Sequence, residues 1–162
     1  MKRRVEMRGM LAVLLFAVSC AQETGAQAHD PAQHGAAVAG GKRTAVKFPQ
    51  ALKDHTLSNM RDHLFALQQI QEALAARAYD RAATIAEQRL GMSSLELHGA
   101  HDVEKFMPAG MQRIGSEMHR AASQFAVAAA NAGATGDPGP PLSALARVVQ
   151  QCVACHASYQ MQ

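Results

Sequence analysis

The sequence predicts an all-α fold, an antiparallel four-helix bundle formed by residues 48–162. Apolar residues in this part of the chain recur every three or four positions, the spacing of one face of a helix. No stretch shows the strict alternation of apolar and polar residues that is typical of a half-buried strand. Stretches that contain proline or glycine divide the helical pattern into four segments.

The first two predicted helices form the first half of the bundle. The first follows Pro49 and runs to about Arg77, with an apolar stripe at Leu57, Met60, Leu64, Leu67, Ile70 and Leu74. The second begins near Asp80, a residue type that caps helix N-termini, and runs to Gly91 or a few residues further. Its many alanines allow a neighbouring helix to approach closely.

The last two predicted helices follow Pro108 and the proline pair 140–141, since proline is favoured in the first turn of a helix. The third ends near Asn131–Gly133, and its apolar positions are Met111, Ile114, Met118, Ala122, Phe125 and Ala129. Residues 133–141 are a loop by composition. The fourth helix carries Leu145, Val149, Cys152 and His156 on one face.

The N-terminus is typical of an exported protein. Basic residues precede the apolar run 10–18, which is too short to span a bilayer, and small residues allow cleavage after Ala21 or after Ala28. We therefore expect a signal peptide at 1–21 and a periplasmic location. Residues 22–47 lack an apolar period and predict a flexible tail. Cys20 is either removed with the signal peptide or lipidated, and only lipidation would attach the protein to a membrane.

Charge excludes one class of partner. Four of the sixteen Lys and Arg residues, and one of the thirteen acidic residues, lie in 1–21. The remainder has a formal net charge of zero, so the sequence does not indicate a nucleic-acid-binding protein.

The strongest motif is Cys152-Val153-Ala154-Cys155-His156, close to the C-terminus. In a C-x-x-C-H sequence the two thiols add to the vinyl groups of one haem, and the histidine that follows ligates the iron. A disulfide, a redox C-x-x-C pair or half of a zinc site are the alternatives. A redox pair rarely carries the trailing histidine, and no second cysteine pair exists to complete a zinc site. We therefore expect one covalently bound haem c.

An exported chain of four helices with one C-x-x-C-H in the last helix resembles the class II c-type cytochromes, the cytochrome c′ family. The resemblance covers approximately residues 49–162 and implies a bundle that encloses the haem, with His156 as the proximal iron ligand. Class I cytochromes c carry the motif near the N-terminus, with a Met ligand downstream. Redox proteins would be transient partners, and family members are often homodimers, although the sequence does not distinguish a dimer from a monomer.

The resemblance also implies that a first-helix residue faces the other side of the iron, and Met60 falls near the matching position. In the family this residue is Leu or Phe in five-coordinate, gas-binding members and Met in six-coordinate, low-spin members. Met60 is expected to be the distal ligand. A core role for Met60 and ligation by His63 are the alternatives.

Two positions depart from the family pattern. Gln160 occupies the place of a basic residue that many members carry four residues after the haem histidine. Thr56 occupies the place of an arginine that pairs with a haem propionate, and Lys53 or Arg61 are the candidate replacements.

A second metal site is a further hypothesis from this sequence. His98 and His101 are near one another, and with Met111 and Met118 they offer imidazole and thioether groups, which suit copper. Solvated histidines and core methionines are the alternative interpretation.

The sequence is compatible with three functions. The leading one is a periplasmic monohaem electron carrier, the second is a haem protein that binds nitric oxide or carbon monoxide, and the third is a copper-handling protein. No arrangement of nucleophile, acid or base can be argued from spacing, so we do not expect an enzyme.

Overall fold

The computed structural model describes residues 42–162, and helices make up 78% of this part of the chain. The α-helices are α2 (Gln50–Ala75), α3 (Tyr79–Arg89), α4 (Ala100–Val103), α5 (Ala109–Thr135) and α6 (Gly139–Ser158). Two 3-10 helices, η1 (Met92–Ser94) and η2 (Glu104–Phe106), and two strands, β1 (Thr44–Val46) and β2 (Tyr159–Met161), complete the fold. The prediction of an all-α class is confirmed. The predicted signal peptide, Cys20 and residues 22–41 of the predicted tail lie outside the described residues.

The helix boundaries follow the prolines more closely than the other predicted signals. Pro49 and Pro108 directly precede α2 and α5, as expected. Asp80 lies inside the first turn of α3 and is not its cap. The prediction that α5 ends near Asn131–Gly133 is wrong, because the helix continues to Thr135 and ends at Gly136. Gly136 has a φ of 73°, a left-handed conformation that glycine adopts at little cost.

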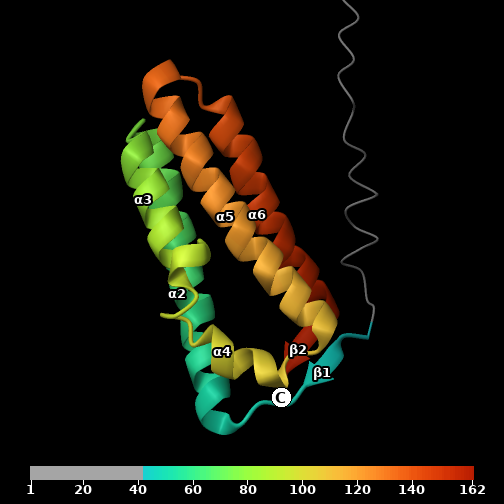
Figure 1. Ribbon diagram of the computed structural model, residues 1–162. Helices are drawn as coiled ribbons and strands as arrows, with labels where there is room; N and C mark the ends of the chain where they lie inside the picture. Colours follow the sequence, from blue (N-terminus) through green and yellow to red (C-terminus); the bar gives the residue numbers. More distant parts are fainter. Residues whose placement is uncertain (1–41) are drawn as a thin grey trace, which may run out of the picture. The chain divides into compact units, whose positions relative to one another are not determined.

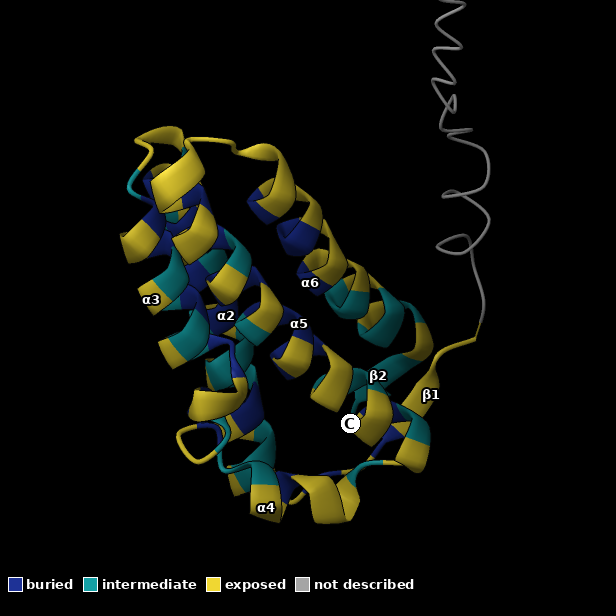
Figure 2. Cartoon of the chain, turned by 45° about the horizontal axis from the view of Figure 1, so that its top comes forward, coloured by how far each residue is buried: buried dark blue, intermediate teal, exposed yellow. Residues whose placement is uncertain are grey.

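The long helices pack side by side (Figure 1). Helix α3 contacts both α2 and α5, and α5 packs along α6. Burial is concentrated on the faces that the helices turn toward one another (Figure 2). Most side chains on these faces are alanines, among them Ala66, Ala82, Ala86, Ala122 and Ala129, so the helices approach closely around Phe125 and Ile70. An ion pair between Arg89 of α3 and Asp62 of α2 crosses the surface of this contact.

The predicted apolar stripe of α2 is wrong in part. Leu64 is 70% exposed, and the buried residues of this helix are Thr56, His63, Ala66, Ile70 and Ala73. The buried face is thus turned away from the larger leucines toward small and polar side chains. Phe65 is also exposed, with the guanidinium of Arg89 5.4 Å from its ring centroid.

The buried face of α6 is also shifted by one residue from the predicted face. Leu145 is buried as expected, but Val148 is buried in place of Val149, which is 38% exposed. Cys152 packs at the edge of the main core, while His156 is exposed on one side of the last turn.

The expectation of no strands is wrong at the two ends of the described chain. Strand β1 pairs in parallel with β2, with Thr44 opposite Tyr159 and Val46 opposite Met161. The predicted boundary between tail and domain at residue 48 therefore falls too late, because β1 belongs to the fold. A second core cluster forms here from Val46, Phe48, Val103 and Met111. Three-residue strands are too short to produce a clear alternating pattern, so this pairing could not be predicted from the sequence.

Within residues 42–162, none of the helices has both the length and the apolar character needed to cross a membrane.

Candidate functional site

A cavity of about 730 Å³ lies between α2, α5, the C-terminal part of α6 and the segment that joins α3 to α5. Pockets that hold cofactors and other small molecules commonly have volumes of about 300–1,000 Å³ and mostly apolar walls. The walls here include the apolar side chains Leu57, Met60, Leu95, Val103, Met107, Met111, Ile114, Met118 and Met161. The cavity therefore has the size and the lining of a cofactor site.

The two cysteines and the histidine of the C-x-x-C-H motif border this cavity. Cys152, Cys155 and His156 lie in the last two turns of α6 and are all lining residues, as is Tyr159 at the start of β2. Both thiols are free and half-buried. The helix brings the two cysteines and the histidine to one end of α6 because they are three and four residues apart, about one helical turn.

Neither thiol has the lowered pKa of an activated cysteine. Burial raises the pKa of Cys152 above its ordinary value, and burial together with the neighbouring Cys152 raises that of Cys155. Reactive thiols in redox C-x-x-C pairs have lowered pKa values instead. The environment of these two cysteines therefore disfavours the alternative of a redox pair.

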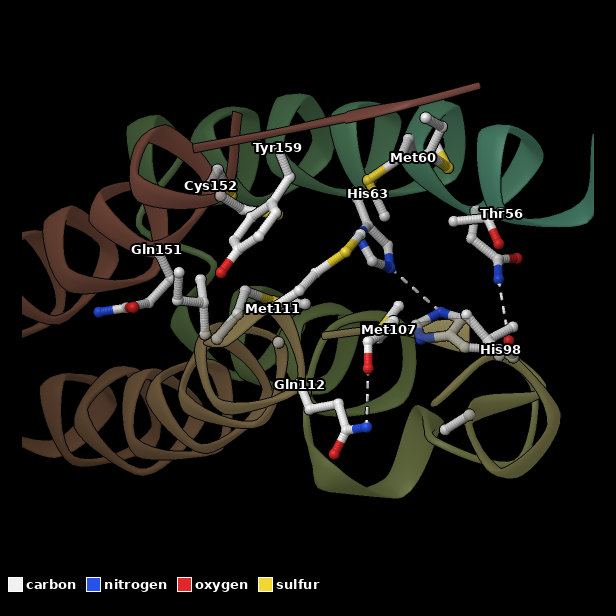
Figure 3. Close-up of a pocket in the computed structure, with 18 of the residues that line it drawn as sticks. Thr56, Met60, His63, His98, Met107, Met111, Gln112, Gln151, Cys152 and Tyr159 are labelled. Atoms are coloured by element: carbon white, nitrogen blue, oxygen red, sulfur yellow. Dashed lines mark hydrogen bonds between the residues drawn. The ribbon is translucent and has the colours of Figure 1, made fainter. Parts of the chain in front are cut away.

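Helix α2 contributes the two residues considered as distal ligands. Met60 and His63 both line the cavity, together with Cys152 and Tyr159 from the C-terminal part of the chain (Figure 3). Met60 is half-buried, and His63 is only 9% exposed. Burial, with smaller contributions from neighbouring imidazoles, lowers the pKa of His63 to about 4, so its ring is neutral near pH 7.

The two histidines of the predicted copper site are not brought together at the cavity. His98 is 6% exposed and lines the cavity, whereas the ring of His101 is largely exposed and lies 3.6 Å from a carboxylate oxygen of Glu104. His98 instead lies beside His63, with 3.3 Å between their Nε2 atoms (Figure 3). Burial lowers its pKa to about 4 as well.

The sequence places His119 beside Met118 among the possible copper ligands but gives it no role, and it is the third buried histidine of residues 42–162. It lies on α5 next to Met118, and its ring centroid is 5.4 Å from that of His98 and 6.3 Å from that of His63. In the sequence His119 is 21 residues from His98 and follows an apolar position of the helix. The only available signal was its place beside the buried stripe of α5.

The basic residues near the cavity only partly follow the sequence hypotheses. Lys53 lines the cavity, while Arg61 is exposed and is not part of its wall. Arg43, just before β1, borders both the cavity and a smaller hollow beside His156. Gln160 leaves the end of the motif without a basic residue of its own, and Arg43 is a cation that the fold brings to the wall beside His156. This arrangement depends on the unpredicted pairing of β1 with β2.

The residues around the cavity fit a covalently bound haem. Two thiols one turn apart and an adjacent imidazole match the chemistry of attachment and proximal ligation, and a thioether and an imidazole from α2 are present for the other side of the iron. The mostly apolar walls suit a porphyrin, and Lys53 and Arg43 are available for its carboxylates.

Comparisons of the chain with protein-family models, with curated proteins and with solved structures gave no match.

Proposed function

We propose that this protein is a periplasmic monohaem c-type cytochrome of the class II kind, which carries single electrons between redox partners. In this proposal the long helices form an antiparallel four-helix bundle around one haem c. The observation that carries the proposal is the common cavity of Cys152, Cys155, His156 and Met60, which come from two helices far apart in the sequence. Support for export comes from the basic and apolar N-terminal segment.

Each of these residues has one role in the proposal. Cys152 and Cys155 form the thioether bonds to the haem, His156 is the proximal ligand and Met60 the distal ligand. The haem supplies a reversible one-electron change at its iron. A thioether and an imidazole as axial ligands raise the reduction potential and leave no open position for a gas molecule.

The surface beside the motif is suited to brief contacts with a redox partner. Val149 and Val153 are exposed on α6, 38% and 48% respectively, and they flank Cys152 in the sequence. Contiguous exposed apolar side chains mark sites where proteins associate, and transient redox complexes bury less than about 1,200 Å² of surface. We expect the partner to dock over this part of α6.

The second candidate is a five-coordinate haem protein of the cytochrome c′ type that binds nitric oxide or carbon monoxide. The observation that favours it is the burial of His63 beside Met60 on the cavity wall. If Met60 does not ligate iron, a neutral imidazole near the vacant position can donate a hydrogen bond to a bound gas molecule.

Visible absorption spectra of the matured protein separate these functions. We expect a low-spin ferrous spectrum and, in the ferric protein, the weak long-wavelength band of a methionine–iron bond. Met60→Ala should remove this band and allow carbon monoxide to bind, whereas Met92→Ala should not, because Met92 is exposed and outside the cavity wall. Cys152→Ser/Cys155→Ser should abolish covalent haem, as measured by intact mass.

A high-spin ferrous wild type that binds carbon monoxide at once would instead support the gas-binding function. A chain that carries no covalent haem after maturation in a cytochrome-producing host would refute both candidates.

A further inference from the structure

Three buried histidines from three separate segments meet at the wall of the cavity. His63 comes from α2, His98 from the turn between η1 and α4, and His119 from α5. Each is less than 10% exposed. Their ring centroids lie 4.6, 5.4 and 6.3 Å apart. Histidine is intermediate between mostly buried and mostly exposed residue types, and a buried polar side chain is more informative than a buried apolar one, so three buried imidazoles together require an explanation.

In the rings of His98 and His119, a hydrogen bond at Nδ1 leaves the lone pair of Nε2 available to a metal ion. The Nδ1 atom of His119 lies 2.8 Å from the carbonyl oxygen of Leu90, which can only accept, so Nδ1 carries the proton. The hydroxyl of Ser94 donates to the carbonyl of Gly91 and can therefore accept from Nδ1 of His98, 3.4 Å away. In both rings Nε2 keeps its lone pair. A hydrogen bond from the ring nitrogen that does not bind the metal is typical of metal-binding histidines.

The spacing of the His63 and His98 rings is close to what one small metal ion requires. Tetrahedral zinc binds imidazole nitrogen at about 2.0–2.1 Å, which places two ligand nitrogens about 3.3–3.4 Å apart and ring centroids about 5 Å apart. The Nε2 atoms of His63 and His98 are 3.3 Å apart. Without a metal, this pair is joined by a hydrogen bond that one ring must donate.

The third ring has to move closer to complete such a site. Among residues 42–162 there is no group of three His, Cys, Asp or Glu side chains already closed around a metal position. The centroid of His119 lies 5.4 Å from that of His98, near the expected spacing, but 6.3 Å from that of His63. Binding of one ion by all three rings therefore requires side-chain rotation that brings the rings of His63 and His119 closer together, and all three residues line the cavity.

We propose that His63, His98 and His119 bind one divalent first-row transition-metal ion through their Nε2 atoms, with zinc as the reference ion. Imidazole ligands suit zinc, copper and nickel, and a three-histidine site leaves one coordination position for a fourth ligand. The site uses none of the haem-motif residues and differs from the predicted copper site, because His101 takes no part. If His63 ligates this ion, it is not available as a ligand of the haem iron.

Zinc binding to the matured protein with its haem tests this proposal. After treatment with EDTA, equilibrium dialysis against zinc is expected to give one tightly bound zinc per chain. His98→Gln and His119→Gln should weaken zinc binding by about 100-fold or more. Ser94→Ala should weaken it by about 10-fold to 100-fold, because the hydrogen bond between Nδ1 of His98 and the Ser94 hydroxyl is lost. His101→Gln is the matched control and should bind zinc as the wild type does, since its ring is exposed.

X-ray absorption at the zinc edge should show three imidazole ligands and no sulfur. The proposal is overturned if His98→Gln and His119→Gln variants that remain helical by circular dichroism bind zinc as the wild type does. It is also overturned if sulfur ligates the zinc. The same holds if binding is lost only when His29 and His34, two histidines of the N-terminal segment 22–41, are both replaced by Gln. Haem content and the haem spectrum are measured in the same samples, so a failure of this site is distinguishable from a failure of the proposed cytochrome function.

Discussion

At the scale of single residues, the buried imidazoles have the largest electrostatic consequence in the described part of the chain. His63 and His98 have pKa values lowered to about 4, chiefly by burial, against an ordinary value of 6.5. In the unfolded chain both rings take up a proton as the pH falls below about 6.5, whereas in the folded protein they do so only near pH 4. Below pH 6.5 the unfolded state therefore binds more protons, and folding becomes less favourable.

We predict that the free energy of unfolding is lower at pH 5 than at pH 7 by about 1–2 kcal/mol for each of these two histidines. Urea denaturation in the presence of EDTA, followed by circular dichroism, measures the difference. His63→Gln/His98→Gln should lose most of this pH dependence, and His101→Gln should keep it. An equal decrease in the double variant and the wild type would show that other groups cause it.

At the scale of the elements, close helix packing depends on alanines more than on large side chains. Ala122, Ala129 and Phe125 on α5 have no exposed surface, and Ala66, Ala82 and Ala86 face them from α2 and α3 in the same core cluster. Because a well-packed core has few voids, an added side chain at such a position forces neighbouring side chains or helices to move.

Ala129→Leu is expected to destabilise the protein by about 1–3 kcal/mol, since the extra carbons have no space between the helices. Ala130→Leu is the matched control, because Ala130 is the next residue of α5 and is exposed, and its effect should stay within about 0.5 kcal/mol. Chemical denaturation measures both. Equal effects of the two substitutions would mean that α5 does not pack through this alanine face.

At the scale of the whole described domain, the sequence predicted the positions of the long helices well and the side-chain environment of the site less well. Prolines mark the start of α2, α5 and α6 because their effect on the backbone is local. The buried face of α2 could not be predicted, because burial of His63 in place of Leu64 depends on tertiary contacts. The histidine cluster has the same origin, since its members lie 35 and 21 residues apart in the sequence. Local sequence patterns do not indicate which residues far apart in the sequence come together in the fold.

The pairing of the two ends of the described chain is the other feature that only the fold reveals. Strand β1 lies beside β2, and the backbone N–H of Gln162 donates to the carbonyl of Val46 at 2.9 Å. Phe48 is buried in the small core beneath these strands, 6.2 Å from the ring centroid of Phe106. Cys155 and Tyr159 pack against the same cluster. The segment before α2 therefore supports the end of α6 that carries the haem motif.

Phe48→Ala tests whether this support contributes to the stability of the domain. Truncation of a buried phenylalanine costs about 3–5 kcal/mol when its cavity does not collapse, and we expect the lower end of this range because the cluster is small. Urea denaturation measures the loss, and amide hydrogen exchange should be faster in β2 than in the wild type because the strand pair is weakened. Phe65→Ala is the matched control: Phe65 is 54% exposed, so its truncation should cost less than about 1 kcal/mol and leave exchange in β2 unchanged. If the two substitutions have similar effects on stability and on β2, the contact between the chain ends does not stabilise the motif-bearing end of α6.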